Sequence, residues 1–258
     1  MRHNTVKAKL KQGIPSFGIW LKAPEASRIE FYGLLGFEFV LIDGEHKSVS
    51  PALCLELVRA CEAVGAIPIV RPPNHEPSTI LQYLETGAMG IYAPHIRTAQ
   101  DAQAIVDAVK YAPLGHRSAG SSERPNGYGF VQPSREYYAK ANEETLIALL
   151  VEDTEGIDHL DEILAVPEMD VVCIGPGDLS LSMGYPEERD APEVMQAVWA
   201  AEARVAAAGL PFDCEPTNAA EARSAIERGA RLVPFFEGNM IAPLFRNVLA
   251  DMRTTWPA

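Results

Sequence analysis

The sequence lacks the features of several protein classes. It contains no run of about 18 uninterrupted apolar residues, so no membrane-spanning helix is expected. No apolar stretch of signal-peptide length follows the basic start MRHNTVKAKLKQG. Lys and Arg total 22 against 35 Asp and Glu, a formal net charge of −13. Nucleic acid and anionic lipid are therefore not expected as partners, because both are bound through surplus positive charge.

Cysteine is scarce and is not arranged as a metal or redox motif. The four cysteines are Cys54, Cys61, Cys173 and Cys214, with no CxxC pair among them. Two of them lie in apolar, strand-like runs. We expect buried, reduced thiols in a cytoplasmic protein.

Short apolar runs alternate with longer helical patterns along the whole chain. The predicted strands are 16–21, 38–43, 66–71, 90–94, 146–152, 171–175, 210–215 and 231–236. The predicted helices are 24–36, 50–65, 77–86, 99–110, 157–165, 192–208, 218–228 and 240–252. Within 50–65, Ser50 is the expected N-cap and Gly65 the expected stop.

Eight strand–helix alternations without a domain-sized linker predict one domain over residues 1–258, folded as a closed (β/α)₈ TIM barrel. Such a barrel needs about 250 residues. The alternative is an open doubly wound sheet, but no GxGxxG follows the first strand. Residues 113–130 form the one long stretch without periodicity, and we expect them to cover a site or reach a neighbouring subunit.

Polar residues gather at the C-terminal ends of the predicted strands, where barrel enzymes build their active sites. Four strand ends carry them: Asp43-Gly44-Glu45-His46, Arg71-Pro72-Pro73, Glu152-Asp153 and Gly175-Pro176-Gly177-Asp178.

Glu152 and Asp178 end neighbouring strands, so their carboxylates are expected to converge. Two carboxylates that close repel each other unless a cation lies between them or one is protonated. No Cys or His stands at matching positions, which favours Mg²⁺ or Mn²⁺ over Zn²⁺, with Co²⁺ a further possibility. The alternative is that each carboxylate caps a helix or pairs with an arginine.

Three further residues are candidates for catalysis. Arg71 follows a buried strand and needs an anionic partner, either a substrate carboxylate or enolate oxygen or a neighbouring Asp or Glu. His46 lies on a polar turn, and histidine side chains titrate near neutral pH, which suits proton transfer. Glu85 is predicted to orient His46 by accepting a ring N–H. Backbone N–H groups over Gly175–Asp178, near a helix start, are predicted to hold a substrate carboxylate.

Lysine is confined to positions 7, 9, 11, 22, 47, 110 and 140, so the last four predicted strands have none. An enzyme that forms a Schiff base needs a desolvated lysine inside the barrel. Lys22 and Lys47, the two near strand ends, adjoin solvated loops. A bound metal is the better candidate for stabilising a carbanion.

The runs LIDGEHKSVS, IVRPP, Glu85-Thr86-Gly87, VEDTEG and CIGPGDLSLSMG resemble, in the same order, the class II (metal-dependent) pyruvate aldolases. The resemblance implies a (β/α)₈ barrel, commonly hexameric, with its last helix exchanged between paired subunits. It also implies that Glu152 and Asp178 are metal ligands, Arg71 the substrate-binding arginine and His46 the acid/base histidine. Glu85 falls where the family often has the carboxylate that supports this histidine.

The sequence departs from the family pattern in places. Leu150 stands where some members have glutamine, and PFFEGNM, with Glu237 and Gly238, lacks the usual Gly-x-Asp after the eighth strand. The metal positions are intact. The resemblance therefore predicts reversible cleavage of a 4-hydroxy-2-oxo acid to pyruvate, or an analogue such as hydroxypyruvate, and an aldehyde. The alternatives are a malyl- or citramalyl-type acyl-CoA lyase, a metal-dependent isomerase or hydrolase, and a non-catalytic metal-binding barrel.

Overall fold

The computed structural model describes residues 1–186 and 188–256. Eight parallel strands form one sheet, in the order β6-β5-β4-β3-β2-β1-β8-β7. The strands are β1 (Ser16–Trp20), β2 (Phe39–Asp43), β3 (Ile67–Arg71), β4 (Gly90–Ala93), β5 (Leu146–Val151), β6 (Val171–Ile174), β7 (Phe212–Asp213) and β8 (Ala230–Phe236). Every predicted strand is present, and the predicted (β/α)₈ barrel is confirmed.

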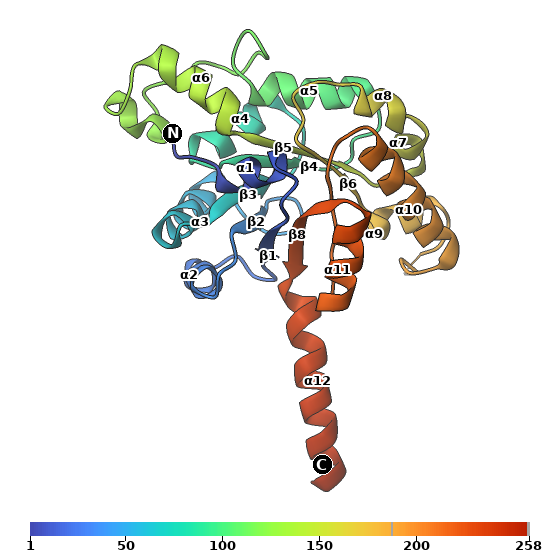
Figure 1. Cartoon of the computed structure of the whole chain (residues 1–258). Coiled ribbons are helices and arrows are strands. Elements are labelled where there is room, and N and C mark those ends of the chain that lie inside the picture. The colour runs from blue at the N-terminus through green and yellow to red at the C-terminus, as the bar shows by residue number, and fades with distance from the viewer. Residues whose placement is uncertain (187, 257–258) are drawn as a thin grey trace.

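Helices alternate with the strands and surround the sheet (Figure 1). They are α1 (Thr5–Lys11), α2 (Ala26–Leu34), α3 (Pro51–Val64), α4 (Pro77–Glu85), α5 (Ala99–Val109), α6 (Ser134–Glu144), α7 (Thr154–Asp158), α8 (Leu160–Leu164), α9 (Pro176–Ser182), α10 (Pro192–Ala207), α11 (Ala219–Arg228) and α12 (Glu237–Thr255), with a 3₁₀ helix at Arg124–Gly129. The predicted caps of α3 are confirmed: the Ser50 side chain accepts from the Leu53 N–H, and Gly65 is left-handed with φ 78°.

The barrel is nearly closed, and its seam lies between β6 and β7. The two strands form no ladder in the described part of the chain. A hydrogen bond from Val172 N to Pro211 O (3.2 Å) joins them near their N-terminal ends. Strand β7 has only two residues and a register irregularity against β8. The seam therefore opens toward the C-terminal ends of the strands.

Alternate strand residues point into the barrel, which packs as a solid core. Leu41, Ile69, Ala148 and Cys173 belong to one buried cluster in its interior, and Tyr92 lies above them with no more than 1% of its surface exposed. On β2 and β3 the next inward positions toward the C-terminal ends are Asp43 and Arg71. The barrel thus supplies a rigid floor on which the site is built.

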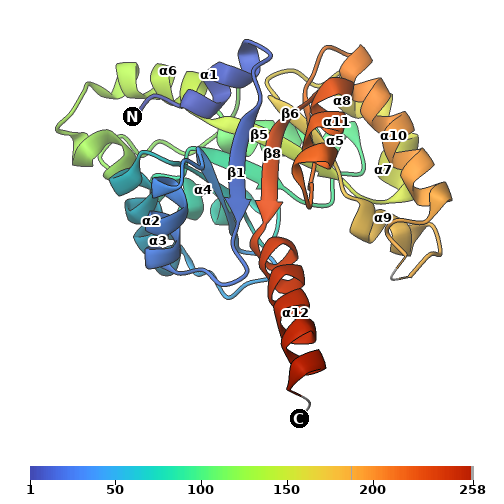
Figure 2. The ribbon, with the colours of Figure 1, turned by 60° about the horizontal axis from the view of Figure 1, so that its bottom comes forward.

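Helix α12 extends away from the barrel in both views (Figures 1 and 2). It exposes a stripe of large apolar side chains: Leu244, Phe245, Val248, Leu249 and Met252 are each 48–61% exposed. The spacing of these residues puts them on one face. An apolar face of this size on a projecting helix needs a covering surface.

Two further sequence expectations bear on the environment of the chain. None of the described helices combines the length and apolarity needed to cross a bilayer. The four cysteines form no disulfide, and three of them are buried as predicted, while Cys214 is half-buried.

Candidate active site

A cavity of about 280 Å³ lies at the C-terminal mouth of the barrel. Asp43, Arg71 and Glu152 lie at the ends of β2, β3 and β5 and form its floor. Gly175 to Asp178, which link β6 to α9, form one wall, and His46 lines another side. The sequence-predicted residues therefore come together here, with Glu85 as the exception. None of residues 113–130 lines this cavity, so within one chain this stretch does not cover the site, contrary to one expectation.

Arg71 is held rigidly on the barrel floor. Its Nε and Nη2 donate to the two carboxylate oxygens of Asp43 at 2.9 and 2.8 Å. Its Nη1 lies 3.0 Å from Glu45 Oε2, and the guanidinium stacks 4.5 Å from the centre of the Trp20 ring. The anionic partners are thus neighbouring acids, the second of the predicted options. The N–H groups not used by Asp43 remain for a substrate oxygen.

This ion pair also fixes the charge state of Asp43. Burial alone would raise the pKa of Asp43, but the hydrogen bonds and positive charge of Arg71 hold the pKa below its ordinary value. Asp43 also accepts from the backbone N–H groups of Glu45 and His46, at 3.1 and 3.2 Å. The turn that carries His46 is therefore tied to the same carboxylate that positions Arg71.

Glu152 is 4% exposed and is oriented by a residue that the sequence reasoning missed. Its Oε1 accepts from the backbone N–H of His95 at 2.9 Å and lies 2.9 Å from His95 Nδ1. His95 Nε2 lies 2.7 Å from Glu45 Oε1. His95 adopts φ 53°, a left-handed conformation uncommon for residues other than glycine. The histidine therefore bridges the Arg71 and Glu152 parts of the site.

The electrostatics of Glu152 fit a bound cation. Burial raises the pKa of Glu152 to about 8, and the nearby carboxylates of Asp178 and Glu45 add to the increase. A divalent cation would relieve this repulsion. The described residues contain no group of three or more His, Cys, Asp or Glu side chains suited to a metal. Two carboxylates and an open cavity suit Mg²⁺ or a similar hard cation, which keeps several coordination positions for water or substrate.

Gly175 leaves the space that Glu152 occupies. A Cβ at position 175 would lie 2.8 Å from Glu152 Cβ and 3.1 Å from its Oε2. The predicted backbone donors are fewer than expected, because Pro176 has no N–H and the Gly175 N–H donates to Val151 O at 2.9 Å. Only Gly177 and Asp178 keep N–H groups for a ligand. Both residues line the cavity.

The predicted support of His46 by Glu85 is wrong within one chain. Glu85 is the last residue of α4, and that helix runs back from the C-terminal to the N-terminal end of the barrel, so Glu85 lies at the end opposite His46. Its Oε1 lies 3.6 Å from Arg117 Nη2 in the long 113–130 stretch. The His46 ring is 60% exposed, and its Nε2 lies 3.7 Å from Glu45 Oε2. Glu45 is therefore the carboxylate next to His46.

Lys110 is desolvated, but it lies at the wrong end of the barrel for Schiff-base chemistry. Burial, together with the neighbouring charge of Lys7, lowers the pKa of Lys110 to about 7. Its Nζ donates to the carbonyl oxygens of Asn142 (2.6 Å) and Thr145 (3.1 Å). Thr145 directly precedes β5, which places this lysine at the N-terminal end. No lysine other than Lys22 and Lys47 lines the cavity at the mouth, among the residues described.

The sequence matches a known protein family. The model of the HpcH/HpaI aldolase/citrate lyase family matches residues 16–235. The chain belongs to this family. Two curated relatives are each 33% identical over 231 residues, 89% of this chain: a 2-keto-3-deoxy-L-rhamnonate aldolase of Salmonella schwarzengrund, covered over 85% of its length, and a hydroxypyruvate/pyruvate aldolase of Roseobacter denitrificans, covered over 89%.

Solved structures of the HpcH/HpaI family share the fold. A family protein from Burkholderia cenocepacia J2315 superposes with a TM-score of 0.89 at 28% identity, covering 97% of this chain and 99% of that one. The family and its aldolase-named members make this chain an enzyme of the aldolase (lyase) class. Divalent-metal dependence is general in the HpcH/HpaI family.

Proposed function

We propose that this HpcH/HpaI enzyme reversibly cleaves a 4-hydroxy-2-oxo acid to pyruvate, or a close analogue such as hydroxypyruvate, and an aldehyde. The observation that carries the proposal is the convergence of Glu152 and Asp178 beside a rigidly held Arg71 in one cavity. A divalent cation held by Glu152 and Asp178, either Mg²⁺ or Mn²⁺ with Co²⁺ as an alternative, would supply a Lewis acid for the oxygens of a 2-oxo acid.

Residues of the chain itself carry out the remaining binding and proton-transfer steps. Arg71 directs its free N–H groups at the C2 oxygen, where negative charge develops as the C3–C4 bond breaks. The Gly177 and Asp178 N–H groups receive the substrate carboxylate. His46, exposed at the rim, takes the C4 hydroxyl proton through a water molecule, and the pyruvate enolate is then protonated at C3. His95 keeps Glu152 and Glu45 in place throughout.

The proposal predicts that the enzyme exchanges the methyl protons of pyruvate with solvent, because this half-reaction needs only the enolate-forming groups. Proton NMR in D₂O should show exchange that stops with EDTA and returns with Mg²⁺, Mn²⁺ or Co²⁺. Absence of exchange with all three metals would refute the aldolase proposal. Turnover of malyl-CoA without free-pyruvate exchange would instead assign the site to an acyl-CoA lyase.

We further propose that the enzyme is a cytoplasmic homo-oligomer, a hexamer by family resemblance, in which α12 packs on a second copy of the chain. The exposed apolar stripe of α12 supports this, as do the exposed Phe31 and Leu34 of α2 and Leu35, which directly follows α2. Burying such a stripe in an interface is favourable by about 25 cal/mol per Å² of apolar surface before the costs of association.

A charge on this stripe is predicted to dissociate the assembly. Leu244→Glu should shift the mass measured by light scattering toward the monomer, because a buried, unpaired carboxylate is costly in an apolar interface. Ala250→Glu, an exposed position of the same helix off the stripe, is the matched control and should keep the wild-type mass. Equal masses for wild type and Leu244→Glu would exclude helix exchange as the basis of assembly.

A further inference from the structure

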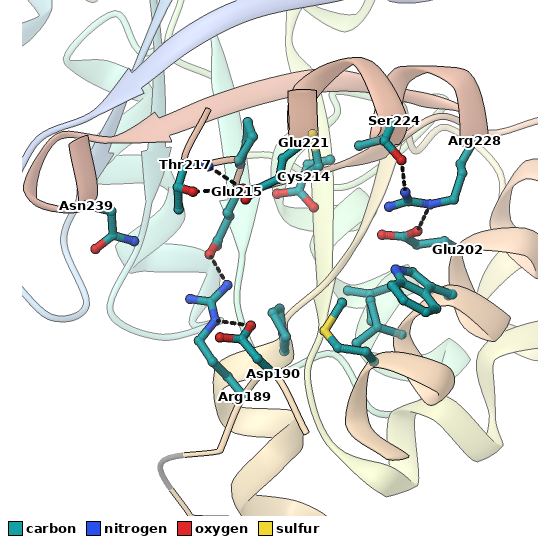
Figure 3. A pocket seen from close by; sticks show the side chains of 18 residues that line it. Arg189, Asp190, Glu202, Cys214, Glu215, Thr217, Glu221, Ser224, Arg228 and Asn239 are labelled. Carbon is teal, nitrogen blue, oxygen red and sulfur yellow. Dashed lines mark hydrogen bonds and ion pairs between the residues drawn. The ribbon is translucent and has the colours of Figure 1, made fainter. Parts of the chain in front are cut away.

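A second cavity, of about 540 Å³, lies where β6 and β7 separate at the barrel seam. Ile174 at the end of β6, Asp213 to Glu215 at the end of β7, and residues of α10 and α11 line it. Figure 3 shows Arg189 beside Glu215 in one part of the cavity and Arg228 beside Glu202 in another. The second cavity shares four lining residues with the metal-side cavity, namely Pro176, Arg189, Glu215 and Asn239. The two cavities are therefore neighbours across a wall of side chains, and nothing in the proposed cleavage so far uses the second one.

The shared wall contains an ion pair. Arg189 Nη2 lies 3.4 Å from Glu215 Oε2, and its Nε lies 3.9 Å from Asp190. Arg189 is about 41% exposed at its side chain and comes from the loop between α9 and α10, whereas Glu215 follows β7. A substrate chain can displace the loop side chain of Arg189 more easily than a close-packed apolar wall, which is stiff.

The part of the second cavity away from Arg189 holds a buried carboxylate with spare hydrogen-bonding capacity. Glu202 is 6% exposed and pairs through Oε2 with Arg228 Nε at 3.0 Å, while its Oε1 has no hydrogen bond among the described residues. Asp213, at the end of β7, is 5% exposed and accepts from the Tyr92 hydroxyl at Oδ2 (2.7 Å). Trp199 is half exposed, with the Arg228 guanidinium 5.9 Å from its ring.

These groups select one chemical class of ligand. Five acidic residues line the cavity against two arginines, and both arginines are already ion-paired: the acids are Asp190, Glu202, Asp213, Glu215 and Glu221. An anionic chain would meet net repulsion. An apolar chain would leave the buried carboxylate oxygens without partners. Hydroxyl groups both donate and accept, so a hydroxylated chain satisfies the carboxylates and the arginines together, and its C–H faces pack on Trp199.

We propose that this cavity, called the seam cavity here, binds the hydroxylated chain of the aldehyde, and that Glu202, Glu215 and Arg189 set the preference for uncharged, polyhydroxylated aldehydes. This inference rests on the proposed aldolase function. It assigns the 2-oxo acid to the metal-side cavity and the remainder of the substrate to the seam.

Three four-carbon aldehydes test the class of ligand: erythrose, butanal and succinic semialdehyde, each added to pyruvate by the Mg²⁺-loaded enzyme. Erythrose should have the highest kcat/KM. Glu202→Gln should lower kcat/KM for erythrose about tenfold, the loss expected for one hydrogen bond to a charged acceptor, and lower it much less for butanal. Glu227→Gln, an exposed α11 position outside the cavity, is the matched control.

A second variant keeps the test decisive if Glu202→Gln does not fold. Ser224→Phe fills the cavity from an exposed position of α11 and should abolish selectivity for erythrose over butanal. Highest activity with succinic semialdehyde or butanal in the wild type would overturn the inference, as would equal losses for erythrose and butanal in both variants. Pyruvate proton exchange, measured alongside, separates the proposals. Exchange without the erythrose preference refutes only the seam cavity, and absence of exchange refutes both.

Discussion

Glu152→Gln is expected to lower metal-dependent pyruvate proton exchange at least a hundredfold. The substitution keeps the size of the side chain and an oxygen for the His95 N–H, but it removes one of the two charges that face the cation. Losing a charged ligand weakens binding of a hard cation whose attraction to oxygen ligands is mainly electrostatic. The exchange rate should be measured at increasing Mg²⁺, because weakened binding is partly overcome at high metal concentration, whereas loss of the site is not.

Thermal unfolding separates this loss from misfolding. Wild-type protein should gain melting temperature on adding Mg²⁺, since a ligand that binds only the folded state stabilises it. A carboxyl with a raised folded-state pKa costs stability as pH rises from its ordinary value toward about 8, so metal-free Glu152→Gln should be at least as stable as wild type at pH 7.5. The variant should lose only the Mg²⁺-dependent gain. An unchanged gain would show that Glu152 is not a ligand.

The strands were predictable because parallel barrel strands are buried on both faces and read as apolar runs. All eight predicted ranges agree with the observed ends to within two residues. The largest discrepancy is β7, predicted over 210–215 and observed as Phe212–Asp213. A polar residue, Asp213, points into the interior there, and the seam removes the pairing partner on one side. The residues of a strand do not reveal from their own sequence that a neighbouring strand is unpaired.

Helices α6 and α1 were missed for a different reason. Helix α6 has the sequence SREYYAKANEE and buries only Tyr137, Ala141 and Asn142, so its apolar period is too weak to detect. Helix α1 buries Lys7, whose ammonium donates to Thr145 O and to Asp170. A buried lysine counts as polar in any periodicity, although its alkyl stem packs as an apolar group.

The site was predictable where strand direction alone determines position. Asp43 and Arg71 end their strands, Glu152 directly follows β5, and Asp178 lies in the first turn of α9, just after β6. Parallel strands bring these ends to one mouth. The prediction for Glu85 was wrong because Glu85 ends a helix, and that helix runs in the direction opposite to the strands. His95 follows β4 in the same way as the others follow their strands, so reading the fourth strand end would have found it. Arg189 lies in a loop between helices, where no rule of strand direction applies.

Arg71→Ala is expected to lower the rate constant of pyruvate exchange by about 10²–10³, the typical cost of losing one preorganised donor to a developing oxyanion. The loss should fall on the rate constant at saturating pyruvate rather than on KM alone, because charge on the C2 oxygen is largest in the transition state. It should also lower stability, since Asp43 and Glu45 would be left buried without the cation that pairs with both.

Chemical rescue tests whether the guanidinium group of Arg71 takes part in the exchange reaction. Truncation to alanine leaves a space above Asp43 and beside Trp20 that fits a planar cation, because both surfaces already position the native group. Added guanidinium at low millimolar concentration should restore part of the exchange rate in Arg71→Ala, and ammonium should not, since a point charge cannot reproduce the bidentate contact with Asp43 and the stack on Trp20. Equal rescue by both cations would reduce Arg71 to a source of positive charge. Rescue by neither, with Asp43 and Glu45 intact and the melting temperature recovered by guanidinium, would remove Arg71 from the reaction and leave it a structural residue.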